Sequence, residues 1–177
     1  MERPNAWLTY SDADMQDLET VAKKYRHFLN VGKTERECIT QIVKEAEEAG
    51  YVSLEEKVKN GEALKAGDKV YQVGMQKIIA LYHIGEEDLA QGMNILCAHI
   101  DSPRLDIKQN PLYEDTDLAY LDTHYYGGVK KYQWVALPMA MHGVIVKKDG
   151  TVVNVTVGED EDDPVLYITD LLIHLAG

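Results

Sequence analysis

The stretch MNILCAHI, residues 93–100, limits the choice of fold more than any other part of this sequence, because its central positions are continuously apolar. Strands of this kind are buried on both faces and are typical of the interior of a sheet covered by helices. His99 nearly closes the stretch, Asp101 follows two residues later, and Pro103 ends it. Alternate side chains of a strand share a face, so the histidine and the aspartate are expected to point the same way. Open α/β sheets bind ligands where such strands end, and the pair is therefore a candidate site.

Two amphipathic helices are expected before this strand. The first begins after Ser11, which has Asp14 three residues later, and the second begins after Thr34, which has Glu37 in the same relation. This spacing is a capping-box pattern, and apolar residues recur at three- and four-residue steps behind each cap. Gly50 is a typical end for the second helix.

The hydrophobic period then changes from that of a helix to that of a strand. Residues 69–75 and 77–85 are expected to be strands joined by a turn at Gly74 and Met75. Helices followed by an interior strand predict an α/β fold with helices packed on a sheet. We expect residues 1–108 to be the first segment of this α/β domain.

From residue 109 onward, short alternating runs rich in tyrosine and glycine predict a β-rich module that covers 109–177. The sequence KKDG lies between two β-branched runs within residues 141–157, which predicts a hairpin. The acidic run GEDEDD, residues 158–163, is interpreted as a solvated loop and not as a cation site, since ligands need convergent geometry. The last residues predict a short strand and then a helix capped by Thr169 or Asp170.

Charge and cysteine usage restrict the partners. The chain carries 18 basic and 30 acidic residues, a formal charge of -12, which disfavours nucleic acid and anionic membranes as partners. No leader segment and no apolar stretch of membrane-spanning length is seen in the sequence. Cys38 and Cys97 both lie in apolar surroundings, and we interpret them as reduced core residues of a cytoplasmic protein.

The His99-x-Asp101 pair suits a metal, because imidazole is a good zinc ligand and a nearby carboxylate can fix its tautomer. The spacing alone leaves a second interpretation open, in which His99 is a strand-end histidine hydrogen-bonded to a neighbour. The other histidines outside this region have no partner at ligand spacing and are interpreted as structural: His27, His83, His124 and His142.

Four stretches, taken in order, carry a family resemblance. AHIDSPRLDIK (98–108) resembles the segment around the first metal ligand of the aspartyl aminopeptidase/aminopeptidase I family of zinc metallopeptidases. YYGGVKKYQW (125–134) resembles that family's glycine segment followed by tryptophan. MHGVIVKKDG (141–150) resembles a family strand and hairpin, and VLYITDLLIHLA (165–176) resembles its Ile-Pro-x-Leu-x-x-His-Leu segment.

The resemblance implies a helix-sheet-helix sandwich of a zinc exopeptidase, with a β-rich dimerisation domain inserted into the catalytic domain. It implies an aminopeptidase that removes N-terminal residues from peptides, uses two zinc ions or similar divalent ions, and assembles into a homo-oligomer, a dodecamer built from dimers. His99 would then be a metal ligand, Asp101 the supporting catalytic carboxylate, and His174 a catalytic residue lent to a neighbouring subunit's active site.

The sequence also departs from the family pattern and leaves alternatives open. WVALPM, residues 134–139, replaces an aromatic and charged family run, and Gly127 and Gly128 are followed by Val129 where the family has a third glycine. These differences indicate a divergent, bacterial-type branch with a preference other than aspartate or glutamate. The family's remaining metal ligands lie beyond residue 177, so this segment is expected to be an N-terminal portion that is inactive alone. A non-catalytic assembly subunit, another dinuclear exopeptidase and a deacylase are the alternatives.

Overall fold

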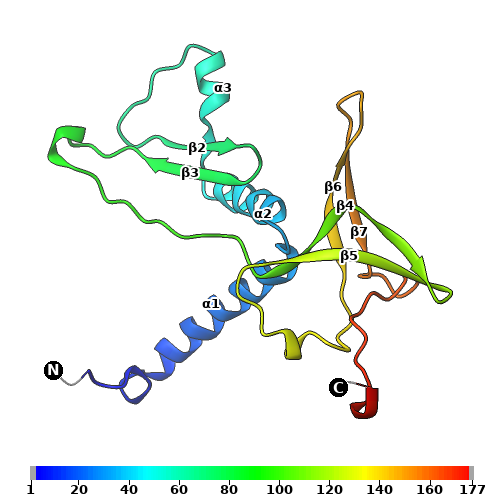
Figure 1. The fold of residues 1–177 in the computed structure, drawn as a ribbon. Helices are drawn as coiled ribbons and strands as arrows, with labels where there is room; N and C mark the ends of the chain where they lie inside the picture. The colour runs from blue at the N-terminus through cyan, green and yellow to red at the C-terminus, as the bar shows by residue number, and fades with distance from the viewer. Residues whose placement is uncertain (1–2, 176–177) are drawn as a thin grey trace. The chain divides into compact units, whose positions relative to one another are not determined.

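The computed structural model of the chain describes residues 3–175 and divides it into two compact units, Met1–Ile100 and Asp101–Gly177 (Figure 1). We call these the N-terminal unit and the C-terminal unit. The division falls earlier than the predicted domain boundary at residues 108 and 109, which lies inside strand β4 (Arg104–Asp115). Within the part of the chain that is described, no helix is both long and apolar enough to cross a membrane.

The first two helices form as the sequence predicts. Helix α1 (Asp12–Val31) and helix α2 (Glu35–Glu48) each begin with a complete capping box, built by Ser11 with Asp14 and by Thr34 with Glu37. In each box the hydroxyl accepts from the N3 backbone amide, and the N3 carboxylate accepts from the cap residue's backbone amide. The short 3-10 turn η1 (Ala6–Leu8) precedes α1.

Helix α2 packs against a small three-stranded sheet in the order β1-β2-β3, where β1 is parallel to β2 and β2 is antiparallel to β3. The elements are β1 (Val52–Ser53), the short helix α3 (Leu54–Lys59), β2 (Lys69–Gly74) and β3 (Ile78–His83). Met75 and Gln76 have φ values of 51° and 60°, so β2 and β3 are joined by a tight hairpin turn at the predicted place.

The sheet and α2 supply the core of the N-terminal unit. Ile39 of α2 and Val70 of β2 are buried, with 1% and 0% of their surface exposed. The Tyr71 hydroxyl of β2 donates to Glu47 of α2 at 2.7 Å, and this hydrogen bond raises the pKa of Tyr71 to about 12. Burial and polar links therefore both hold β2 to α2.

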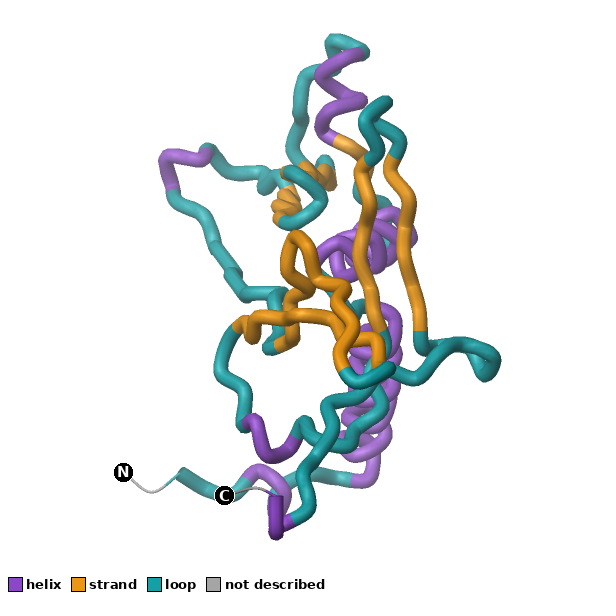
Figure 2. The backbone as a smooth tube through the Cα atoms, turned by 45° about the vertical axis from the view of Figure 1, so that its right-hand side comes forward, coloured by secondary structure: helices purple, strands orange, loops and turns teal. Residues whose placement is uncertain are grey.

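The C-terminal unit consists of two antiparallel hairpins, which are drawn in strand colour in Figure 2. The first pairs β4 with β5 (Leu118–Tyr126), with a register shift between Ile107 and Leu112. The second pairs β6 (Met141–Val146) with β7 (Val152–Val157). The predicted KKDG turn joins β6 and β7, and Gly150 adopts the positive φ of 84° that the turn requires.

The predicted interior strand at residues 93–100 is wrong for this structure. The described chain has no regular structure there between η2 (Leu89–Gln91) and β4, and Figure 1 draws it as plain coil. Ile95 and Leu96 are 76% and 100% exposed. The physical reason is that a strand is held by backbone pairing with its neighbours, and residues 3–175 offer this segment no paired strand.

Two smaller expectations also need correction. Cys38 is buried as predicted, but Cys97 is exposed because it lies in the unpaired segment and not in a core strand. Near the end of the chain, Leu166 and Ile168 make isolated bridges, while a 3-10 turn, η4 (Ile173–Leu175), replaces the expected α-helix among the described residues. Asp170 still accepts a hydrogen bond from the Leu171 amide.

The chain exposes more surface than its mass leads one to expect. Its accessible surface is 15215 Å². Two separate domains of about 10 kDa each would together expose roughly 10,500 Å². Helix α1 contributes to this excess of exposed surface, because none of its side chains is buried. Its apolar residues Met15, Tyr25 and Leu29 remain exposed. Much apolar surface is thus left uncovered in both units.

Candidate metal-binding and catalytic residues

His99 lies in the N-terminal unit, near the end of the irregular segment 92–103, and its side chain is exposed. The residue after it, Ile100, is half-buried, and its carbonyl oxygen lies 3.9 Å from the Cys38 Sγ atom of α2. Burial raises the pKa of the Cys38 thiol, and the carboxylates of Glu37 and Glu35 raise it further, so Cys38 is a protonated core residue. The exposed side chain of His99 thus lies one residue before a half-buried position of the chain.

Asp101 is the first residue of the C-terminal unit and is partly buried. Its Oδ2 atom accepts a hydrogen bond from the hydroxyl of Tyr126, at 2.9 Å. Tyr126 is the last residue of β5 and pairs with Arg104, the first residue of β4. The carboxylate is therefore held by the open end of the β4–β5 hairpin.

His174 is in the η4 turn of the C-terminal unit, and its side chain is exposed. An exposed position is compatible with the role that the family resemblance implies for His174, which is to reach a neighbouring subunit.

The described residues contain no group of three or more histidine, cysteine, aspartate or glutamate side chains arranged to hold a metal ion. Imidazole nitrogen and carboxylate oxygen are donors that zinc accepts, and a zinc ion takes about four ligands. His99 and Asp101 are thus of chemical types that zinc accepts, and the described residues do not complete a zinc site around either of them. The assignment of the three site residues stays a prediction.

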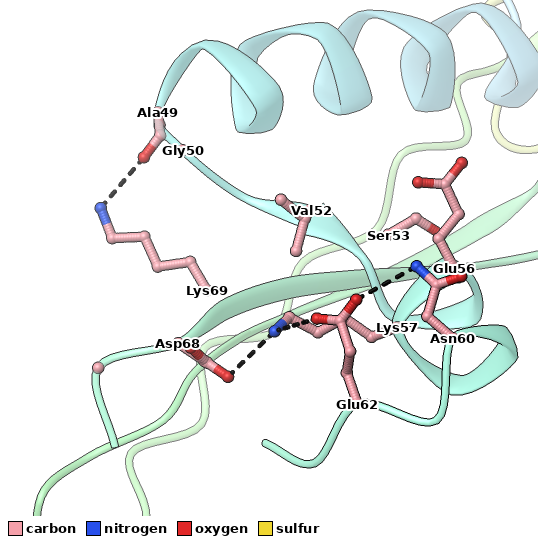
Figure 3. Close-up of a pocket in the computed structure, with 11 residues that line it drawn as sticks. Ala49, Gly50, Val52, Ser53, Glu56, Lys57, Asn60, Glu62, Asp68 and Lys69 are labelled. Atoms are coloured by element: carbon pink, nitrogen blue, oxygen red, sulfur yellow. Dashed lines mark hydrogen bonds and ion pairs between the residues drawn. The ribbon is translucent and has the colours of Figure 1, made fainter. Parts of the chain in front are cut away.

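An open pocket of about 630 Å³ lies elsewhere in the N-terminal unit, between α3 and the start of β2 (Figure 3). Three of its charged side chains form ion pairs with one another: Lys57 pairs with both Glu62 and Asp68, at 3.4 Å each. The backbone amide of Lys65 donates to Asp68 and lowers the pKa of that carboxyl, which favours the ionised partner of Lys57. None of the predicted site residues lines this pocket, and its polar groups stabilise the local fold.

Tyr126 is the residue near the predicted site that sequence reasoning missed. Its segment, YYGG, is prominent in the sequence, but the position of its hydroxyl depends on the pairing of β4 with β5. The register shift within that hairpin is not visible in the sequence.

Comparison with known proteins decides the family. Residues 28–177 match the family model described as aminopeptidase I zinc metalloprotease (M18). The chain belongs to the M18 family. The family predicted from the four sequence stretches is thereby confirmed.

Curated M18 relatives match over nearly the whole chain. A probable M18 family aminopeptidase 1 from Clostridium acetobutylicum is 57% identical over 176 residues, which are 99% of this chain and 38% of the relative. The corresponding protein of Thermotoga maritima is 42% identical over 179 residues, covering 99% of this chain and 37% of the relative. The chain therefore spans less than half the length of these M18 relatives.

Solved M18 structures share the fold. The crystal structure of aminopeptidase I from Clostridium acetobutylicum matches with a TM-score of 0.84 and 56% identity, covering 99% of this chain and 39% of that one. Aminopeptidase I from Borrelia burgdorferi B31 matches with a TM-score of 0.87 and 35% identity, covering 96% and 41%. The predicted α/β fold class is confirmed for this M18 portion.

Proposed function

We propose that the full-length protein is a zinc-dependent aminopeptidase that removes N-terminal residues from peptides, and that this chain is its N-terminal portion. The observation that carries the proposal is the M18 match across residues 28–177, which includes the His99-x-Asp101 segment. Identity of 57% to a probable M18 aminopeptidase supports the same activity.

In this proposal each residue has a separate task. His99 would hold a metal ion through an imidazole nitrogen, and Asp101 would be the catalytic carboxylate that supports that centre. When bound, zinc supplies a Lewis acid that makes water nucleophilic near neutral pH. His174 donates a hydrogen bond to the oxyanion that develops on the scissile carbonyl of a peptide bound to a neighbouring subunit. The further ligands come from the part of the enzyme that follows residue 177.

The large exposed surface of 15215 Å² supports the proposal that more protein covers this chain in the working enzyme. We propose a homo-oligomer, with a dodecamer built from dimers as its specific form, two zinc ions per active site, and a cytoplasmic location. We also propose that residues 109–177 form the first part of the inserted dimerisation domain.

Metal removal tests the proposed activity. Full-length protein treated with a chelator is expected to lose roughly 10²-fold or more in turnover, because the metal contributes several kcal/mol of transition-state stabilisation. Activity should return when zinc or a similar divalent ion is added. Release of free amino acids from a panel of unblocked peptides, one for each N-terminal residue, measures turnover and reveals the preferred residue.

Peptides of the same sequence with an acetylated N-terminus are the matched control. Turnover of unblocked peptides alone supports an aminopeptidase, whereas cleavage of the acetyl group alone would assign the protein to the deacylases. A metal-loaded, assembled protein with no turnover on either set would assign it to a non-catalytic assembly role.

His174→Ala in the full-length protein is expected to lower kcat about 10²-fold, the usual effect of removing one donor to an oxyanion. Zinc content should stay near that of the wild type, since His174 is not proposed as a ligand. Elemental analysis alongside steady-state kinetics checks both quantities. Zinc loss in this variant would show that the roles are assigned wrongly.

A further inference from the structure

The carboxylate of Asp101 is held by a tyrosine that no sequence pattern assigns to the site. The Tyr126 hydroxyl lies 2.9 Å from Asp101 Oδ2 and donates a hydrogen bond to it. The two residues are 25 positions apart, so this contact comes from the pairing of β4 with β5 and not from local sequence. Its length lies within the ordinary range for a hydroxyl that donates to an oxygen, so its contribution is to restrain the direction of the carboxylate.

The backbone around Tyr126 is built to place its side chain there. Gly127 turns the chain away from β5 with a φ of 74°, a backbone conformation that residues with a Cβ rarely adopt. A Cβ at Gly127 would lie 3.4 Å from Pro103 Cα, so the turn passes close to the segment that follows Asp101. Tyr126 and Arg104 are also opposite each other in the strand register. The end of β5 is therefore fixed beside residues 101–104.

The aromatic ring of Tyr126 is also held in place, by a contact with Arg104. The Arg104 guanidinium lies 4.1 Å from the ring centroid, within the range of a cation–π interaction. Arg104 is held in turn by Asp106, with Nε 2.7 Å from the carboxylate oxygen. A phenol restrained in this way can direct its hydroxyl to one place.

We propose that Tyr126 is a positioning residue for Asp101, an inference that rests on the function proposed above. A free carboxylate rotates about its Cβ–Cγ bond and samples many orientations. A hydrogen bond to Oδ2 fixes the plane of the group and thereby sets the direction of its other oxygen. Tyr126 thus orients the carboxylate that supports the metal centre, as partners of metal-site carboxylates commonly do.

Tyr126→Phe in the full-length enzyme tests this inference, because phenylalanine keeps the ring beneath Arg104 and removes only the hydroxyl. We expect zinc affinity, measured by competition with a chelating dye, to fall about tenfold, the lower end of the effect reported for such partners. We expect kcat to fall by a similar factor while KM stays near the wild-type value. Tyr126→Trp, which also lacks the hydroxyl but keeps an aromatic ring, is the second variant.

Tyr125→Phe is the matched control. Tyr125 is the preceding residue of β5 and is half-exposed, and among the described residues its hydroxyl has no hydrogen-bond partner. Its ring stacks on His124 and lies below Lys131, contacts that phenylalanine retains. Zinc affinity and kcat should both stay within about twofold of wild type.

A double-mutant cycle separates positioning from general stability. If Tyr126 acts through Asp101, Tyr126→Phe should weaken zinc binding in the wild-type background and have no further effect in an Asp101→Ala background. An equal loss in both backgrounds, or unchanged zinc affinity and kcat in both Tyr126 variants, would overturn the inference. A wild-type enzyme that neither binds zinc nor cleaves peptides would instead refute the proposed function itself.

Discussion

His99→Ala in the full-length protein is expected to lower peptide turnover roughly 10³-fold and to reduce the zinc content of the purified enzyme. His99 is the one metal ligand that we propose in this chain, and loss of a ligand removes several kcal/mol of charge stabilisation. Turnover on unblocked peptides and elemental analysis of the same preparation measure the two effects. Both should change together, because the lost activity is the consequence of lost metal.

His83→Ala is the control for His99. His83 ends β3, is exposed like His99, and belongs to no stretch that resembles a family metal site. Its replacement should leave turnover and zinc content unchanged. Full turnover of His99→Ala would remove the basis for a metal-dependent mechanism at this residue.

Ile39→Ala is expected to lower the free energy of unfolding of the 177-residue chain by about 2–5 kcal/mol. Ile39 is 1% exposed and lies on the face of α2 that packs against the β1–β3 sheet. Truncation removes buried apolar atoms and leaves a cavity that the surrounding helix and sheet can fill only in part. Urea unfolding followed by circular dichroism measures the change.

Ile78→Ala provides the same change of side chain at an exposed site. Ile78 begins β3 in the same unit and is 67% exposed, so its truncation should cost about 0.5 kcal/mol or less. Equal losses at the two positions would show that α2 and the sheet do not form the core described above.

The helices and turns could be predicted because their causes are local. The side chains of Thr34 and Glu37 each accept a hydrogen bond from the other residue's backbone amide within one helical turn. The KKDG sequence supplies a glycine where the hairpin needs a positive φ. Burial of Cys38 followed from its place on the apolar side of α2. The short helix α3 was missed, although Ser53 accepts from the Glu56 amide as an N-cap.

The hydrophobic pattern led to two wrong predictions, a strand at residues 93–100 and a buried Cys97. An apolar run shows that a segment favours burial, but a strand also needs neighbours to pair with, and these are distant in sequence. The same limit applies to Tyr126, since its contact with Asp101 depends on the β4–β5 register. The candidate site residues remain a prediction from the sequence, whereas the contact that supports Asp101 could be found only in the structure.

The exposed stretch from Met93 to His99 has a consequence for how the isolated chain behaves in solution. Extended apolar backbone without ladder partners can add to the sheet of another copy and begin aggregation. The formal charge of -12 opposes this, because copies of like charge repel one another over about 10 Å at an ionic strength of 0.1 M. Added salt shortens the range of this repulsion. The solubility of the isolated chain therefore depends on whether repulsion between its negative charges outweighs association through the exposed apolar segment.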